Sequence, residues 1–178
     1  MRKIIYGLMM VFIASNALAL EYPIGKPIIQ NGMEIGVVYL QAIEMVPKGM
    51  MPDPKQADIH LEADIHATQN NVNGFAEGDW IPYLVIHYKI QKMNSHDKPI
   101  EGMLMPMVAN DGPHYGDNVK LDGPGKYNLT YTIMPPSMAT PVEFGRHIDK
   151  ETGVAEWFKP FETHYVFTFA GIGKKGGY

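Results

Sequence analysis

The chain has 178 residues, with 15 Lys and Arg against 19 Asp and Glu, and it contains 13 methionines and no cysteine. The acidic balance argues against nucleic acid as a partner, and the missing cysteines exclude disulfides, thiolate ligands and iron–sulfur clusters. A metal site in this chain must therefore use His, Met, Asp and Glu.

The first 19 residues have the features of a secretory signal peptide. Arg2 and Lys3 precede a largely apolar run over residues 4–14, and Ala17-Leu18-Ala19 matches a cleavage site. The apolar run is shorter than the roughly 20 residues that a membrane span needs. We therefore expect residues 1–19 to be removed on export to the periplasm. Residues 20–178 should remain as one soluble domain without a membrane span, and loss of Arg2 and Lys3 takes the net charge from −4 to −6.

A first strand is predicted over residues 34–42, and residues 57–67 then carry the strongest pattern in the chain, an unbroken alternation of apolar and ionisable side chains. Successive side chains of a strand point to opposite faces, so we expect one buried apolar face and one face equipped for chemistry. The second face would carry only carboxylates and imidazoles: Asp58, His60, Glu62, Asp64 and His66.

This pattern favours a metal site over a plain acidic surface, which is the alternative interpretation. At about 3.3 Å per residue, His60 and Glu62 are close enough to bind one ion, whereas His66 lies about 20 Å from His60. We expect the His60 side chain to contribute little to packing, because it points away from the apolar face.

Further strands are predicted over residues 83–90, 103–108, 127–133 and 161–169. Pro106 should mark an edge or a bulge, because proline cannot donate to a strand ladder. A turn over residues 110–113 can fold Met107 back toward His114. Residues 144–153 form a predicted hairpin or loop with His147 near its tip.

The fold class follows from these elements. Turn signals recur every 8–15 residues or so, and no stretch of the mature chain has a convincing helical period. Leu121, Pro124-Gly125 and Tyr127 are arranged as in the tyrosine corner of immunoglobulin-like sandwiches. The sequence therefore predicts an all-β, immunoglobulin-like β-sandwich with a single domain.

Several motifs together resemble a known family. They are the signal peptide, the mature start at residues 21–25, the strand over residues 60–66, Met107 with residues 110–116, and the Pro-Gly-x-Tyr corner. With these features the sequence is similar to the bacterial periplasmic high-affinity iron-transport proteins that are encoded beside an inner-membrane iron permease. The resemblance covers essentially the whole mature chain.

The resemblance implies an immunoglobulin-like homodimer that binds copper near the dimer interface and handles iron at or beside the same site. The copper ligands that it implies are His60, Met107, His114 and His147, with Glu62 as an adjacent carboxylate. The chemistry of these side chains agrees, since imidazoles and a thioether favour copper and a carboxylate oxygen favours iron. Without the resemblance, Met107 could be a core residue and His147 a surface loop residue.

We also expect Glu21 or Asp111 of one subunit to approach the metal site of the other, because both precede or flank the ligand motifs. The expected function is a metal-binding component of iron uptake that works with the permease. The alternatives are a periplasmic copper-binding or copper-trafficking protein and a copper-dependent ferrous-iron oxidase. No Ser-His-Asp or paired-carboxylate arrangement suggests a hydrolase, so an enzymatic role is the less favoured hypothesis.

Overall fold

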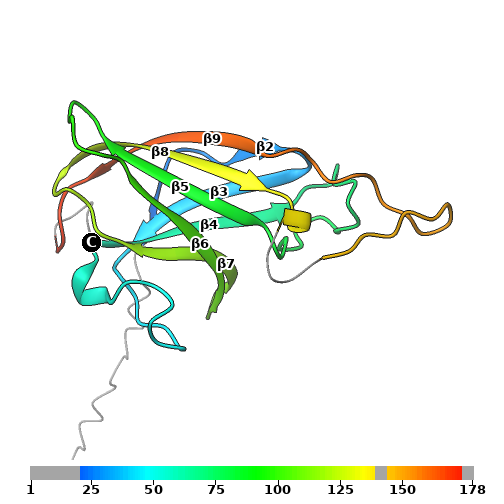
Figure 1. Ribbon diagram of the computed structural model, residues 1–178, viewed down its shortest axis with the longest axis horizontal. Coiled ribbons are helices and arrows are strands. Elements are labelled where there is room, and N and C mark those ends of the chain that lie inside the picture. Colours follow the sequence, from blue (N-terminus) through cyan, green and yellow to red (C-terminus); the bar gives the residue numbers. More distant parts are fainter. Residues whose placement is uncertain (1–20, 139–143, 174–178) are drawn as a thin grey trace, which may run out of the picture.

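The computed structural model describes residues 21–138 and 144–173, and the predicted signal peptide lies outside these residues. The described chain is all-β, as the sequence predicts (Figure 1). Its strands are β1 (Tyr22–Pro23), β2 (Ile28–Gln30), β3 (Met33–Leu40), β4 (Ile59–Ala67), β5 (Val85–Lys92), β6 (Ile100–Ala109), β7 (Gly112–Val119), β8 (Gly125–Met134) and β9 (Phe161–Phe169). Two three-residue 3-10 helices, η1 (Pro54–Gln56) and η2 (Pro136–Met138), complete the elements, and over this part of the chain no helix could cross a membrane.

The strands form one curled antiparallel arrangement in the order β1-β3-β4-β7-β6-β5-β8-β9, with β2 beside β3. Strand β6 divides this arrangement, because residues 100–104 pair with β5 and residues 105–109 pair with β7. Pro106 lies in the second half, where β7 is the neighbour on one side and the described strands supply none on the other. The predicted edge position of Pro106 is thus confirmed.

The hydrophobic core lies between the two halves of the curled sheet. Alternate residues of β4 and β8 are fully buried in it: Ile59, Leu61, Ala63, Ile65, Tyr127, Leu129, Tyr131 and Ile133. The ring of Tyr39 of β3 lies 5.6 Å from that of Phe167 of β9, tilted by 47°, and the Tyr39 hydroxyl donates to the Thr168 carbonyl at 3.2 Å. The Tyr127 hydroxyl donates to the carbonyl of Gly123, which is the contact expected of a tyrosine corner.

Two predictions about the strands need correction. Strand β7 was missed, because the sequence analysis placed only a turn and His114 there. The alternative interpretation of residues 57–67, a plain acidic surface, is wrong at two positions, since His60 is 0% and Glu62 7% exposed. The segment between β3 and β4 is held against this face by Asn118, whose amide donates to the carbonyls of Ile43 and Pro52. His60 therefore contributes to packing, contrary to expectation.

Candidate metal centre

Three neighbouring strands place the predicted donors on the same face of the sheet. His60 and Glu62 come from β4, His114 from β7 and Met107 from β6. Glu62 lies opposite Gly116 in the ladder, and His114 lies opposite Met107. Directly opposed residues of antiparallel strands project to the same side, so the four side chains share the face turned away from the core.

The donor atoms of three of these residues converge. Glu62 Oε1 lies 3.5 Å from His60 Nε2 and 3.4 Å from His114 Nε2. All three side chains are buried, and their ligand atoms lie within 4.8 Å of one another. Two donors that are each about 2.1 Å from a tetrahedral metal ion are separated by about 3.4 Å. The cluster is thus spaced as a metal site requires, before any rearrangement.

Both imidazole nitrogens that face Glu62 lack a hydrogen-bond partner. His60 Nε2 and His114 Nε2 are among the few buried polar side-chain atoms without one in the described chain. Such atoms are rare in folded proteins because each loses its hydration without replacement. A metal ion placed between them would supply the missing interaction, so the residues present fit a bound metal.

The orientation of the His60 ring is set by Asn118, which is buried on β7 directly opposite His60. Because the Asn118 amide nitrogen donates to two loop carbonyls, its Oδ1 must be the acceptor, and it takes the Ile43 N–H at 3.1 Å. His60 Nδ1 therefore donates to this oxygen at 3.0 Å. The proton is fixed on Nδ1, and Nε2 presents its lone pair to the site.

Gly116 makes room for the His60 ring. A Cβ atom at this position would lie 2.5 Å from His60 Nε2 and 3.3 Å from Met107 Cε. The imidazole nitrogen and the thioether methyl are thus both within 3.3 Å of one point, in the space that a side chain would otherwise fill. Met107 therefore lies near His60, and it is paired with His114 in the ladder.

The electrostatics of the site prepare it for a cation. Burial, followed by the negative charges of Asp64, Glu21 and Asp111, raises the pKa of Glu62 to about 8. Burial lowers the pKa of His60 to about 4, and the hydrogen bond with Asn118 only partly opposes this. At neutral pH Glu62 is thus protonated and His60 is neutral, so their close approach is not an ion pair. A cation would displace the Glu62 proton and meet a bare imidazole nitrogen.

An acidic cavity of about 280 Å³ adjoins the cluster. It is lined by Glu21, Glu62, Asp64, His66, Asp111, Gly112, Pro113 and His114. Burial and the charges of Asp111 and Asp64 raise the pKa of Glu21, and burial raises that of Asp64. A bound cation would offset the nearby negative charges that raise the pKa of Glu62 and Glu21, and the oxygen-rich lining of the cavity would suit a hard metal ion.

The predicted residues therefore fall into two groups. Glu21 and Asp111 line the cavity of their own chain, and they join His60, Glu62, Met107 and His114 around the centre. His147 does not join them: its side chain is 73% exposed on the segment between β8 and β9, and its Nδ1 lies 2.9 Å from Thr152 Oγ1.

Two residues of the centre escaped the sequence analysis. Asn118 could not be predicted as a residue of the site, because an isolated asparagine belongs to no pattern in the sequence. Gly116 was part of the motif beside His114, but its role as a gap for His60 depends on strand register. Asp64 was recognised on the ionisable face and is now placed in the cavity.

Comparison with known proteins adds independent information. The family described as Fe2+ transport protein matches residues 18–171. A UPF0423 protein of Brucella abortus strain 2308 is 60% identical over 166 residues, which cover 93% of this chain and 91% of that protein.

Two solved structures are similar to the whole described fold. A copper-bound variant of Campylobacter jejuni P19 matches with a TM-score of 0.82 and 50% identity, covering 86% of this chain and 99% of that one. FetP of uropathogenic Escherichia coli strain F11, produced recombinantly in the periplasm, matches with a TM-score of 0.80 and 51% identity, covering 86% and 98%.

Proposed function

The chain belongs to the Fe2+ transport protein family, and from this membership we propose that it is the periplasmic metal-binding protein of a high-affinity iron uptake system. The observation that carries the proposal is the pair of buried, unpartnered imidazole nitrogens on either side of the Glu62 carboxyl. The similar P19 structure is copper-bound, and FetP was produced in the periplasm, which supports both the metal and the compartment.

Two metals are proposed for two parts of the centre. Copper is held by His60, His114 and Met107, because imidazoles and a thioether suit it. Iron is the cargo, and it binds through Glu62 and the acidic cavity, where carboxylate oxygens predominate. Glu62 belongs to both groups, so the two ions would lie side by side.

Export and delivery complete the proposal. Residues 1–19 act as the signal peptide, and residues 20–178 form the mature metal-binding domain. Transport across a membrane needs a membrane-embedded component, so an inner-membrane iron permease is the proposed partner. The family description and the resemblance drawn from the sequence support this partnership.

We further infer that the domain is an immunoglobulin-like sandwich that forms a homodimer. The tyrosine corner at Tyr127 and the division of β6 between two sets of strands support the fold. The position of His147 supports the dimer, because this predicted ligand lies on an exposed segment that extends away from the strands (Figure 1). A second copy could bring its His147 to the centre of the first.

The dimer leads to a first prediction. His147→Ala should weaken copper binding about tenfold or more while leaving the dimer intact, since one imidazole is a small part of an interface but one of four donors. Light scattering at micromolar concentration and copper titration measure the two properties. A monomeric wild type, or unchanged copper affinity in the variant, would rule out this arrangement.

The division between metals gives a second prediction. Glu62→Gln keeps the size of the side chain and removes the charge, so it should weaken iron binding more than copper binding. Met107→Leu removes the soft donor and should weaken cuprous copper most. Titration of each variant with both metals tests this, and equal losses for the two metals would point to one undifferentiated site.

A copper-trafficking role remains the second candidate, and the Met107 thioether beside two imidazoles is the observation that favours it. Growth of a deletion strain separates the candidates: sensitivity to iron chelation supports iron uptake, and sensitivity to added copper supports trafficking. A copper-dependent ferrous oxidase is the third candidate. It would fail if dioxygen uptake by the copper-loaded protein did not respond to ferrous iron.

A further inference from the structure

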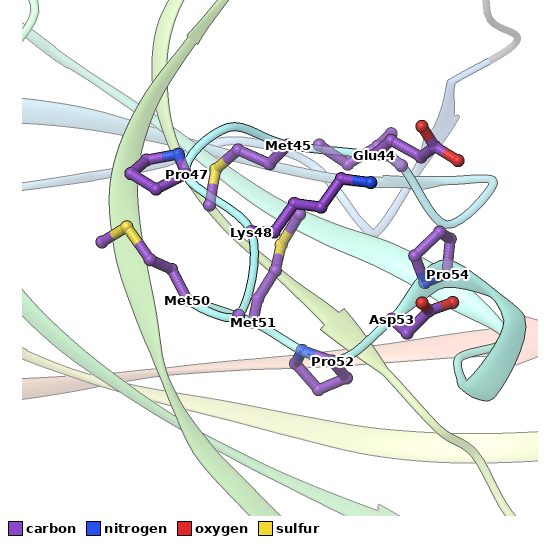
Figure 2. Close-up of a pocket in the computed structure, with 11 residues that line it drawn as sticks. Glu44, Met45, Pro47, Lys48, Met50, Met51, Pro52, Asp53 and Pro54 are labelled. Carbon is purple, nitrogen blue, oxygen red and sulfur yellow. The ribbon is translucent and has the colours of Figure 1, made fainter.

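Residues 43–54, which we name the methionine loop, carry three methionines outside the centre described above. Met45, Met50 and Met51 line a cavity of about 210 Å³ that is formed within this loop between β3 and η1. Figure 2 shows the thioethers of Met45 and Met50 on the side of Pro47, with that of Met51 between the two arms of the loop.

These methionines do not serve as core residues. Met33 is the one methionine in the buried core of the described residues. No methionine is among the partly buried side chains that pack against this core. Met50 is 54% exposed, and Met45 and Met51 are half-buried. The three side chains therefore gain only part of the free energy that full burial would give, which leaves room for a role other than packing.

The donor chemistry of the cavity is specific. Its lining contains no histidine, and the chain has no cysteine, so thioether sulfur is the only soft donor available there. Thioethers select cuprous copper over harder ions such as ferrous iron. The Lys48 ammonium, which would repel a cation, points toward Glu44 and away from Met45 and Met50 in Figure 2.

The methionine loop is also tied to the buried centre. The Asn118 side chain accepts from the Ile43 N–H and donates to the carbonyls of Ile43 and Pro52, near the two ends of the loop. The same Asn118 oxygen accepts from His60 Nδ1. A single buried amide therefore connects the methionine loop to the ring of His60.

We propose that Met45, Met50 and Met51 form a second metal site, which binds a cuprous ion at the surface next to the buried centre. The three side chains line one cavity, and the three rotatable bonds of methionine allow each thioether to adjust its position within it. This site is distinct from the His60, Glu62 and His114 cluster and does not depend on the proposed iron function.

Silver(I), which mimics cuprous copper without redox chemistry, is the probe for this site. Native mass spectrometry and calorimetric titration should find two silver ions per wild-type chain. The Met45→Leu/Met50→Leu/Met51→Leu variant should bind one, with the ion in the loop lost, since leucine keeps the volume but removes the donor. Met93→Leu/Met138→Leu changes two exposed methionines elsewhere and should still bind two.

His114→Ala separates this inference from the proposed function, because it should remove the other ion and leave the one in the loop. Retention of both ions by the triple leucine variant would overturn the second site. The methyl resonances of Met45, Met50 and Met51 in the wild-type protein provide a check that needs no variant. They should shift on addition of silver, and unchanged resonances would also overturn the proposal.

Discussion

Gly116→Ala should abolish tight copper binding at the buried centre. The new methyl carbon would lie 2.5 Å from His60 Nε2, whereas ordinary contact begins at about 3.5 Å. The ring must therefore move by about 1 Å, against the hydrogen bond that fixes it to Asn118. We expect copper affinity to fall about 100-fold, at the upper end of what disturbance of a ligand's support costs. Competition titration with a copper chelator measures the loss.

Gly36→Ala is the matched control for this substitution. Gly36 also lies in a strand on the same face, but a Cβ atom there would meet Asp64 atoms at 3.7 Å, which is ordinary contact. This variant should bind copper as the wild type does. Equal copper affinity in Gly116→Ala and wild type would show that His60 Nε2 is not a ligand.

Glu62→Gln should make the metal-free protein more stable at pH 8. The pKa of Glu62 is about 8 in the folded chain against an ordinary value of 4.5, so the folded state holds a proton that the unfolded state releases between these values. The contribution of Glu62 to the free energy of unfolding is therefore fully present below pH 4.5. It is lost as pH rises toward 8, at up to about 1.4 kcal/mol per pH unit.

Glutamine does not ionise, so the free energy of unfolding of the variant does not fall in this way as pH rises. At pH 8 its free energy of unfolding should exceed that of the wild type by about 3–5 kcal/mol, which raises the Tm by about 10 °C. At pH 4.5 the two proteins should unfold alike. The lowered pKa of His60 makes the free energy of unfolding rise with pH instead, but this effect is present in both proteins.

Thermal unfolding of the metal-free proteins between pH 4.5 and 8 tests this expectation. Glu101→Gln is the control, because Glu101 is exposed and lies 3.9 Å from Lys89, and its change should stay within about 0.5 kcal/mol. Parallel curves for wild type and Glu62→Gln would show that Glu62 ionises normally. With copper or iron bound, the advantage of the variant should shrink, because the metal stabilises the carboxylate.

The sequence was most informative for β4, because this strand has core residues on one face and candidate metal ligands on the other. The alternation in β4 predicted the strand itself, its apolar face and the proximity of His60 and Glu62. The range of β9 was predicted without error, because its aromatic residues alternate over nine positions. What β4 could not reveal is that its ionisable face is also buried at His60 and Glu62, since the covering segment is held by a residue 58 positions away from His60.

Strand β7 shows the opposite case. Its sequence contains Gly112, Pro113, Gly116, Asp117 and Asn118, which are poor strand formers. Pairing on both sides, with β4 and β6, overrides these preferences. Gly116 is needed for the His60 ring and Asn118 for its orientation, so the residues that weaken the strand signal are those that build the site. Local propensity was therefore least informative at the centre itself.

The division of β6 gives the two kinds of donor different freedom to move. His60, Glu62 and His114 stand on β4 and β7, each of which is hydrogen-bonded to a strand on both sides. Met107 stands on the half of β6 that has left β5 and is paired on one side only. If these residues hold copper, a change in its preferred coordination would leave the imidazoles on their doubly paired strands in place. The Met107 thioether, on a sheet edge, would be the donor that moves.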